Sequence, residues 1–268
     1  MKEYLDMGKN GQTTFKVSKT PIIENLIKQK RFDDALTEID LILKSDYSDV
    51  NLNLKGIILD KLSRFSEAIE CFNKALDIND IEDYHLNMAN CYYDWAKVTF
   101  FPEGDYTKAL NLIEEALNAL PENHDPSEFY FLKAEILEAL NELAEAQKAY
   151  LTAYKEFDRL KELEEQMDYL ANTSDTLINI VGSSFYDFTP EKGLVVDLAR
   201  DGENEHDPDA IAVLVDGEKI GYVANSEYTL ISEVKSATDI QNMLHDNQKA
   251  EILFIYLGEY VIAKLIYI

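Results

Sequence analysis

The amino-acid sequence predicts a two-domain α+β protein: an all-α array of antiparallel helix pairs, followed by a small β-barrel with one or two helices. Up to about Asn172, Leu, Ala, Glu and Lys recur at three- and four-residue spacing and glycine is nearly absent, a pattern typical of helices. From Asp175 onward, short runs of Val, Ile, Leu and Tyr are broken by Gly, Asp and Asn, a pattern typical of strands. We therefore divide the chain into an N-terminal extension (1–19), a helical repeat domain with a capping helix (20–172) and a barrel domain (176–268).

The composition is that of a folded acidic protein. The 268 residues include 51 Asp and Glu against 25 Lys and Arg, a net charge of −26, and 46% are hydrophobic, so the chain can bury a core. This charge argues against a broad basic surface for nucleic acid or anionic lipid. No apolar run reaches the roughly 18 residues that span a bilayer, and Met1 to Thr20 lacks the apolar stretch of a secretion signal. The 2 cysteines make no disulfide framework, so we expect a soluble, reduced, cytoplasmic protein.

A motif repeats within the helical part. An alanine recurs with an aromatic residue or leucine three positions before it and a bulky residue four positions after it. The repeated alanines are Ala35, Ala68, Ala109 and Ala146, at spacings of 33, 41 and 37 residues. A helix that contains a small residue, such as Gly56, precedes the alanine helix. Small residues let two antiparallel helices approach closely, so we expect Gly56 and Ala68 at helix–helix contacts.

This repeat resembles the tetratricopeptide repeat over roughly residues 20–157. The unit from Asp49 to about Glu82 fits the motif best, and the third unit carries an insertion around Val98–Gly104. The resemblance implies a concave groove lined by the first helix of each pair. By register, the groove residues are Val50, Asn53, Ile57, Lys61, Leu86, Asn90, Tyr93, Phe131, Glu135 and Glu138.

The predicted groove is mixed in character and acidic toward its C-terminal end. Leu86 stands where relatives that hold a chaperone's C-terminal carboxylate have a lysine. We therefore expect a neutral or basic amphipathic segment of a protein partner in the groove, with Asn90, Tyr93 and Glu135 as contacts. The alternative that stays open is that the repeats serve only as a spacer or a dimerisation surface.

Six short strands are expected in the C-terminal part, over residues 176–182, 193–200, 210–215, 218–223, 250–257 and 260–268. Asp216-Gly217 joins the third and fourth strands, and this pair in a two-residue gap favours a type I′ hairpin turn. Asn225 stands where it could cap a helix that runs to about Lys235, and a second short helix is expected near 238–245. Six short strands with one or two helices suggest a small closed or partly closed barrel.

Three segments of this part resemble the HIRAN domain: Ile180–Tyr186, Arg200–Val213 and Lys219–Val223. Their order and spacing match over nearly all of residues 176–268. The resemblance implies an OB/SH3-like barrel that holds the 3′ end of single-stranded DNA. An aromatic ring stacks on a base, a carboxylate contacts the terminal hydroxyl, and basic residues hold phosphate. Stacking accepts any base and contributes ~1–3 kcal/mol for each one.

The resemblance also assigns roles to single residues. Phe185 and His206 take the stacking positions and Asp207 takes the hydroxyl-binding position. Tyr186 and Tyr222, which lie in the matching segments, complete the set expected to bind a nucleic-acid end. The structural alternatives are that Phe185 is a core residue, that His206 caps a loop, and that Asp207 belongs to an Asx-type turn.

Two residues depart from the DNA-binding members of the family. Ser184 stands where they have arginine, and Asn225 stands where they have lysine. Residues 175–268 hold 17 acidic and 6 basic side chains, a net charge of −11, so phosphate would be poorly compensated.

The sequence contains no catalytic signature. It has no phosphate loop, no Gly-x-Gly-x-x-Gly, and no Cys or His partner at ligand spacing for its 4 histidines. We therefore expect no enzyme, no cofactor and no metal. The predicted function is a non-catalytic adaptor whose groove binds a protein or peptide and whose barrel recognises single-stranded DNA 3′ ends. The alternative is an adaptor for protein–protein interaction alone, with a barrel that has lost DNA binding.

Overall fold

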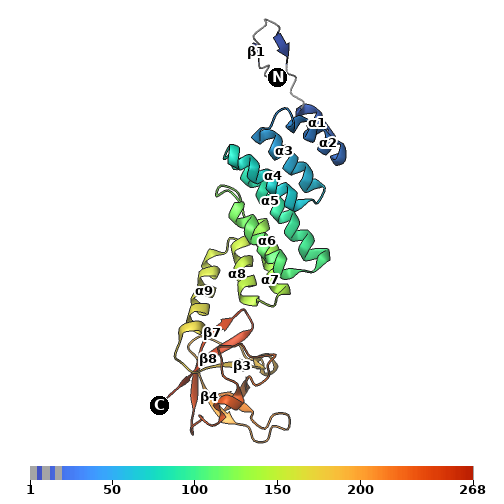
Figure 1. The fold of residues 1–268 in the computed structure, drawn as a ribbon. Coiled ribbons are helices and arrows are strands. Elements are labelled where there is room, and N and C mark those ends of the chain that lie inside the picture. The colour runs from blue at the N-terminus through green and yellow to red at the C-terminus, as the bar shows by residue number, and fades with distance from the viewer. Residues whose placement is uncertain (1–4, 8–12, 16–19, 268) are drawn as a thin grey trace. The chain divides into compact units, whose positions relative to one another are not determined.

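The computed structural model describes residues 5–7, 13–15 and 20–267 and divides the chain into two compact units, Met1–Tyr154 and Lys155–Ile268 (Figure 1). In the N-terminal extension, β1 (Leu5–Met7) pairs with β2 (Thr13–Phe15) in an antiparallel ladder. The rest of that extension lies outside the described residues. None of the helices in the described part of the chain is long and apolar enough to cross a membrane.

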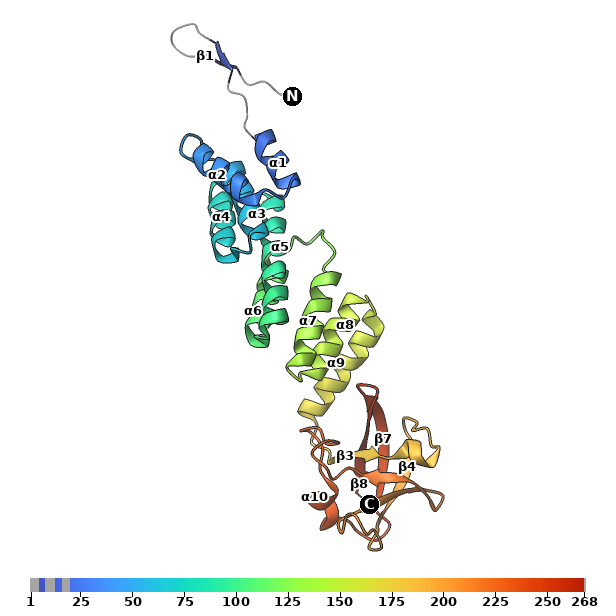
Figure 2. The ribbon, with the colours of Figure 1, turned by 90° about the vertical axis from the view of Figure 1, so that its right-hand side faces the viewer.

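The first unit is the predicted array of helix pairs, and consecutive helices pack antiparallel in it (Figure 2). The helices are α1 (Thr20–Lys28), α2 (Phe32–Leu43), α3 (Asp49–Lys61), α4 (Phe65–Ile78), α5 (Glu82–Val98), α6 (Tyr106–Ala119), α7 (Ser127–Ala139) and α8 (Leu143–Ala153). In the pairs α1–α2, α3–α4, α5–α6 and α7–α8, the second helix carries the repeated alanine. All four of these alanines are buried in the structure.

Close packing between α3 and α4 depends on Gly56. A Cβ atom added at this glycine would lie 2.5 Å from Cε1 of Phe72, a ring that is 1% exposed. Ala68, on α4, is fully buried in the same core cluster as Phe72. The predicted contact positions of Gly56 and Ala68 are therefore confirmed.

The insertion predicted around Val98–Gly104 forms a kinked segment, η1 (Thr99–Glu103), in which Phe101 is extended with a φ of −145° and a ψ of 120°. Gly104 ends the segment with a φ of 74°, in the left-handed region where glycine is favoured. Asp105 then caps α6 by accepting a hydrogen bond from the Lys108 amide at 3.1 Å. This side-chain acceptor satisfies one of the unpaired amides of the first turn and fixes where α6 begins.

The second unit contains the predicted six-stranded barrel. Its strands are β3 (Leu177–Val181), β4 (Val195–Arg200), β5 (Ile211–Val215), β6 (Glu218–Val223), β7 (Lys249–Tyr256) and β8 (Tyr260–Ile266). They close in the order β3-β6-β5-β4-β7-β8, and each strand is antiparallel to both neighbours. Asp216 and Gly217 have φ angles of 51° and 84°, as the predicted type I′ turn between β5 and β6 requires.

One predicted helix of this unit is wrong. Residues 225–235 form turns, and Asn225 is not a helix cap. The second expected helix is present as α10 (Ala237–Gln241). Ser236 caps its N-terminus, and Ser236 and Asp239 form a capping box in which each side chain accepts a hydrogen bond from the other residue's amide. The side chain of Asn225 accepts a hydrogen bond from the Thr238 amide at 3.0 Å, so it supports α10 from outside the helix.

Helix α9 (Phe157–Asn172) belongs to the second unit, whereas our boundary after residue 172 grouped it with the repeats. The ring of Tyr169 on α9 meets the ring of Phe254 on β7 edge-to-face, with centroids 6.0 Å apart. The tyrosine hydroxyl also donates to Asp175 Oδ2 at 2.6 Å. These contacts fix the C-terminal end of α9 on the barrel, and a role of α9 as a cap of the repeats stays a prediction.

Candidate functional site

The predicted stacking residue Phe185 lies on η2 (Ser183–Tyr186), the 3₁₀ turn that follows β3. Gly182 precedes this turn with a φ of 80°. The side chain of Phe185 is 91% exposed, so the alternative that it is a core residue is wrong. An aromatic ring this exposed has both faces open to a base.

Tyr186 and Tyr222 lie next to Phe185 in the fold, because β6 pairs with β3 directly before η2. Partial burial and a hydrogen bond with the Tyr222 hydroxyl raise the pKa of Tyr186. The phenol of Tyr186 therefore stays protonated at neutral pH, and its side chain is 40% exposed. The structure thus brings the three predicted aromatic residues Phe185, Tyr186 and Tyr222 together.

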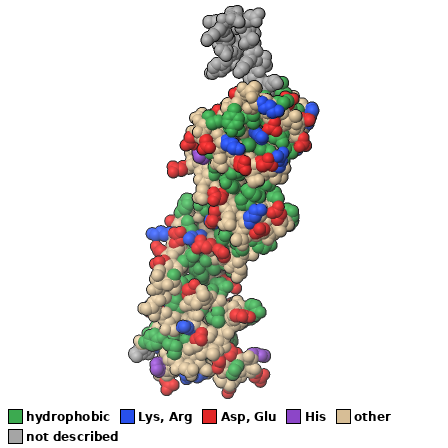
Figure 3. Space-filling view, viewed as in Figure 1, with side chains coloured by type: hydrophobic (Ala, Val, Ile, Leu, Met, Phe, Trp, Pro, Cys, Tyr) green, Lys and Arg blue, Asp and Glu red, His purple; other side chains and the backbone are tan. Residues whose placement is uncertain are grey.

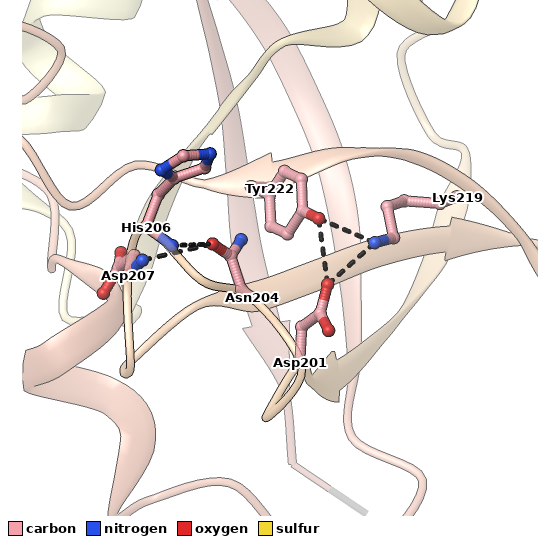
Figure 4. Close-up of polar contacts among 6 residues, drawn as sticks. All are labelled: Asp201, Asn204, His206, Asp207, Lys219 and Tyr222. Carbon is pink, nitrogen blue, oxygen red and sulfur yellow. Dashed lines mark hydrogen bonds and ion pairs between the residues drawn. The ribbon is translucent and has the colours of Figure 1, made fainter.

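A charged cluster adjoins these tyrosines. Lys219 Nζ donates to Asp201 Oδ2 at 2.7 Å and to the Tyr222 hydroxyl at 2.6 Å, and that hydroxyl donates to the same aspartate oxygen at 2.9 Å (Figure 4). The ammonium group also lies 4.7 Å from the centroid of the Tyr222 ring. Hydrogen bonding to Lys219 and then Tyr222 lowers the pKa of Asp201, and the bond to Asp201 raises the pKa of Lys219. The ammonium and the carboxylate are therefore both charged at neutral pH, and they compensate each other.

A bulge in β6 explains how Lys219 and Tyr222 reach the same face of the sheet. Residues an odd number of positions apart on a regular strand point to opposite faces. Here Gly221 pairs with Val213 and Lys219 pairs with Leu214, so Ile220 is an extra residue in the ladder. The extra residue turns the Lys219 side chain to the face that Tyr222 occupies.

The loop from Asn204 to Asp209 is held by its own side chains. Asn204 Oδ1 accepts from the amides of His206 and Asp207 at 2.9 and 3.1 Å (Figure 4), and Asp207 Oδ1 accepts from the Asp209 amide at 2.9 Å. The Asx-type turn at Asp207 is therefore confirmed. The imidazole of His206 is exposed, and within the described residues it has no hydrogen-bond partner.

Asp207 is also tied to the residue that replaces the family's lysine. Asn225 Nδ2 donates to Asp207 Oδ2 at 2.9 Å. Each oxygen of the carboxylate thus accepts one protein hydrogen bond. Because a carboxylate has about four acceptor sites, Asp207 keeps capacity for a terminal hydroxyl.

The basic side chains of the barrel are mostly engaged. Lys219, Lys249 and Lys264 are ion-paired with Asp201, Asp197 and Glu251 at 2.7, 2.6 and 3.2 Å. The Arg200 guanidinium donates to the carbonyls of Gln241 and Leu244 at 2.6 and 3.1 Å, at the end of α10. Lys192 and Lys235 are left without an ion-pair partner among the described residues. Figure 3 shows acidic side chains spread over the visible face, which further weakens any attraction for phosphate.

Sequence reasoning missed the roles of Asp201, Asn204 and Lys219. All three stand inside the segments that resemble the HIRAN domain. The bulge places Lys219 beside Asp201, and the loop hydrogen bonds show that Asn204 holds the amides of His206 and Asp207. No group of three His, Cys, Asp or Glu side chains in the described part of the chain is arranged to hold a metal ion.

In the helical unit, predicted groove residues of α3 contact residues of α5 that were not in the predicted set. Asn87 Nδ2 on α5 donates to Asn53 Oδ1 on α3 at 3.1 Å. Lys61 Nζ on α3 lies 3.3 Å from Asp94 Oδ2 on α5. Ile57 packs half-buried against the core cluster between α3 and α5. These contacts place the predicted residues of α3 along α5.

Helix α7 contacts α5 through Phe129, which was not in the predicted set, and contacts the α8 end through the predicted residues Phe131 and Glu138. Tyr93 on α5 packs against Phe129 on α7, with ring centroids 5.1 Å apart. Phe131 instead meets Tyr154 edge-to-face at 4.9 Å, and Glu138 accepts from the Tyr150 hydroxyl at 3.0 Å. The C-terminal end of the predicted groove therefore includes tyrosines of and after α8, which sequence register did not indicate.

The surroundings of Tyr93 are acidic. Burial, followed by the carboxylates of Glu128, Asp94 and Glu135, raises the pKa of the Tyr93 phenol. Asn90 and Glu135 are exposed and have no hydrogen-bond partner among the described residues. This part of α5 and α7 thus combines an aromatic ring, a free amide and a free carboxylate.

Comparison with known families identifies both units. Models of the tetratricopeptide repeat match residues 47–122 and 127–156, and the model of the HIRAN domain matches residues 174–250. The chain therefore carries tetratricopeptide repeats followed by a HIRAN domain, as the sequence predicted.

Several solved structures are similar to part of this chain. MamA is 17% identical and covers 53% of this chain and 78% of its own, with a TM-score of 0.38. BtubC (BKLC) from P. vanneervenii is 21% identical and covers 55% of this chain and 62% of its own, with a TM-score of 0.35. The first TPR of Spaghetti (RPAP3) bound to the HSP90 peptide SRMEEVD is 20% identical and covers 46% of this chain and 94% of its own, with a TM-score of 0.27. The search of curated proteins found no match.

Proposed function

We propose that this protein is a non-catalytic adaptor that joins a protein partner, bound by its repeats, to a single-stranded nucleic-acid 3′ end, bound by its barrel. The observation that carries the proposal is the fully exposed Phe185 ring beside Tyr186 and Tyr222, in a domain that the HIRAN family matches. We also propose that it acts in the cytoplasm, because Cys71 and Cys91 are free thiols buried in the helical core, as a reducing compartment allows.

The chemistry of end recognition follows from short-range contacts. A base stacks on Phe185, and the exposed imidazole of His206 offers a second ring. Asp207 accepts the terminal 3′ hydroxyl with its remaining lone pairs. Because the charged side chain of Lys219 is already compensated by Asp201, phosphate contributes little to the affinity. We therefore expect weak binding whose salt dependence is shallow.

The end-binding residues are tested with a short labelled oligonucleotide that carries a free 3′ hydroxyl. Phe185→Ala and Asp207→Ala are each expected to abolish the anisotropy change at low salt, because one removes the stacking surface and the other the hydroxyl acceptor. A phosphate on the 3′ end of the oligonucleotide is expected to abolish binding to the wild-type protein. Tyr228→Ala is the matched control, since Tyr228 is 86% exposed and lies outside the cluster.

Binding that ignores the 3′ phosphate, or that survives both substitutions, would contradict end recognition. Asp207→Asn adds a second check, because an amide can accept the Asp209 hydrogen bond and preserve the turn. The decisive result would be that Asp207→Ala abolishes oligonucleotide binding, that Asp207→Asn retains it, and that a 3′ phosphate on the oligonucleotide does not change the affinity. Asp207 would then hold the loop structure and would not contact the terminal hydroxyl.

For the repeats, we propose a neutral or basic amphipathic segment as the ligand, since the carboxylates around Tyr93 favour cationic side chains. The double variant Tyr93→Ala, Glu135→Lys is expected to lose partners that the wild-type chain retains from a cell extract. Glu70→Lys makes the same charge change at an exposed site on α4, and this variant should retain the partners. A double variant that retains every partner, with unchanged unfolding, would contradict the groove.

One observation favours the second candidate, an adaptor for protein–protein interaction alone. The residue in place of the family's lysine, Asn225, is bonded to Asp207 and to the amide of Thr238, so it serves the loop structure. With Ser184 at the arginine position, no Lys or Arg without an ion-pair partner stands beside the aromatic cluster in the described part of the chain. Absence of any oligonucleotide binding by the intact protein at low salt would make this second function the better one.

A further inference from the structure

A second surface of the barrel unit is hollowed beside β7. The hollow has a volume of about 510 Å³, in the range of peptide and ligand sites. Glu162, Glu165 and Tyr169 of α9 line one wall, and Lys192, in the segment before β4, lines another. The floor is the strand segment Ile252–Ile255 of β7.

The floor of the hollow is a free strand edge. β7 pairs with β8 from Lys249 to Tyr256, with a bulge between Ile252 and Phe254, but its ladder with β4 covers only Lys249–Glu251. Ile252 still exchanges hydrogen bonds with Gly193 and Leu194 on that side. Beyond it, the backbone of Leu253, Phe254 and Ile255 has no partner on the β4 side among the described residues.

The side chains of this segment line the hollow without a break. The ladder between β7 and β8 has a bulge between Ile252 and Phe254, which interrupts the regular alternation of side chains. Four consecutive residues, Ile252–Ile255, therefore line the hollow. Ile252 is buried in the barrel, whereas Ile255 is 42% exposed. The edge presents both backbone groups and apolar side chains.

The walls give the edge a charge preference. Glu162, Glu165 and Gln166 lie three and four residues apart on α9 and so share one face of the helix. Glu165 makes one weak contact, 3.8 Å from Lys161, and Glu162 accepts from Gln166 at 3.5 Å. Two exposed carboxylates on α9 and one exposed ammonium group, that of Lys192, therefore stand beside an apolar floor, so the lining carries a net negative charge.

We propose that this edge of β7 is a docking site for an extended segment of a partner protein in which apolar and basic side chains alternate. The segment adds a strand to β7 and pairs with those amides and carbonyls of Leu253–Ile255 that point away from β8. Its apolar side chains meet Phe254 and Ile255, and its basic side chains face Glu162 and Glu165. The alternation of an extended chain matches this pairing of an apolar floor with an acidic wall.

The site is independent of the proposed nucleic-acid site. In the closed order β3-β6-β5-β4-β7-β8, strand β7 stands three places from β6 in either direction. The strand that carries Lys219 and Tyr222 is therefore across the barrel from the free edge. Both sites can be occupied at once, and loss of one leaves the other intact.

The test uses the full chain and a labelled octapeptide of alternating valine and lysine, with fluorescence anisotropy as the measurement. We expect the peptide to bind and a valine–glutamate octapeptide not to bind. Two further valine–lysine peptides carry backbone N-methyl groups, the first on its valines and the second on its lysines. Both peptides carry the same number of methyl groups, but only one of them loses the amide donors that face β7. The peptide that loses these donors is expected to bind about tenfold more weakly, because a typical hydrogen bond contributes about 1 kcal/mol, and the other methylated peptide is expected to bind like the unmethylated one.

Protein variants complete the test. Glu162→Lys is expected to lower the affinity for the valine–lysine peptide about fivefold, which is the contribution of one exposed charge pair. Ile255→Lys is expected to lower this affinity at least as much. Glu164→Lys makes the same charge change on the opposite face of α9 and is expected to have less than half that effect. Absence of valine–lysine binding, equal weakening by both methylated peptides, or equal effects of Glu162→Lys and Glu164→Lys would overturn the proposal.

Discussion

Gly56→Leu is expected to destabilise the helical unit by about 1–3 kcal/mol, the usual range for overpacking a core. Even a Cβ at this position would lie 2.5 Å from Cε1 of Phe72, and the ring is 1% exposed, so it has no free volume to move into. The helix pair α3–α4 must then separate. Urea unfolding followed by far-ultraviolet circular dichroism measures the loss, because the helical unit gives most of this signal.

A double-variant cycle shows whether the Phe72 ring is the cause. Phe72→Ala on its own also destabilises the unit, since it empties a core position. If leucine at position 56 fills the volume that the ring vacates, the two substitutions together cost less than the sum of their separate effects. Gly202→Ala is the control, because a Cβ there meets nothing within 4 Å. Additive effects, or an unchanged Gly56→Leu protein, would count against the repeat register.

The same register argument predicted the helical unit well, for a physical reason. Small residues at fixed spacing report helix–helix contact, and this contact is a local property of each pair. The type I′ turn at Asp216-Gly217 was predictable for a similar reason, because two consecutive left-handed residues require such a pair. Helix α9 shows the limit of this reasoning. We expected this helix to cap the repeats. Leu163 and Leu170 on it are buried, but apolar residues at helical spacing do not specify which surface covers them.

The barrel site was predictable as a set of residues but not as a set of contacts. Phe185, Tyr186 and Tyr222 were placed by motif. Their connection to Asp201 and Lys219 depends on the extra residue Ile220 in β6, and a bulge has no reliable signal in one sequence. Asn225 was misassigned because an asparagine before a polar run favours a helix cap as well as a loop bridge. Only tertiary contacts with Asp207 and Thr238 distinguish the two.

The ion pair between Lys219 and Asp201 suggests how the affinity for nucleic acid can be increased, namely by removing the carboxylate that neutralises the lysine. Asp201→Asn keeps the shape of the side chain and its hydrogen bonds to Lys219 and Tyr222, but it leaves the ammonium uncompensated. In the wild-type protein, the lowered pKa of Asp201 keeps this carboxyl ionised at neutral and mildly acidic pH, so the ion pair with Lys219 persists there. Ser184→Arg adds a second cation at an exposed position beside Phe185.

The double variant Asp201→Asn, Ser184→Arg is expected to bind a short single-stranded oligonucleotide about thirtyfold more tightly than the wild-type protein at low salt. Two new phosphate contacts of about 1 kcal/mol each give this factor. They should also steepen the slope of log affinity against log salt concentration by about 1.4, since each phosphate neutralised on a single strand contributes about 0.7. The measurement is anisotropy titration at several salt concentrations.

The controls make the same charge changes elsewhere on the barrel. Glu203→Gln removes one exposed carboxylate from the loop that contains Asp201 but releases no lysine, and Thr189→Arg adds one exposed cation after η2. Their combination alters the net charge of the domain as the test variant does, so a general field effect would raise affinity equally in both. Equal affinities would show that Lys219 and position 184 do not contact phosphate. A larger and steeper gain in the test variant alone would show that the aromatic cluster binds the strand and that loss of free cations, rather than loss of the stacking surface, sets its affinity.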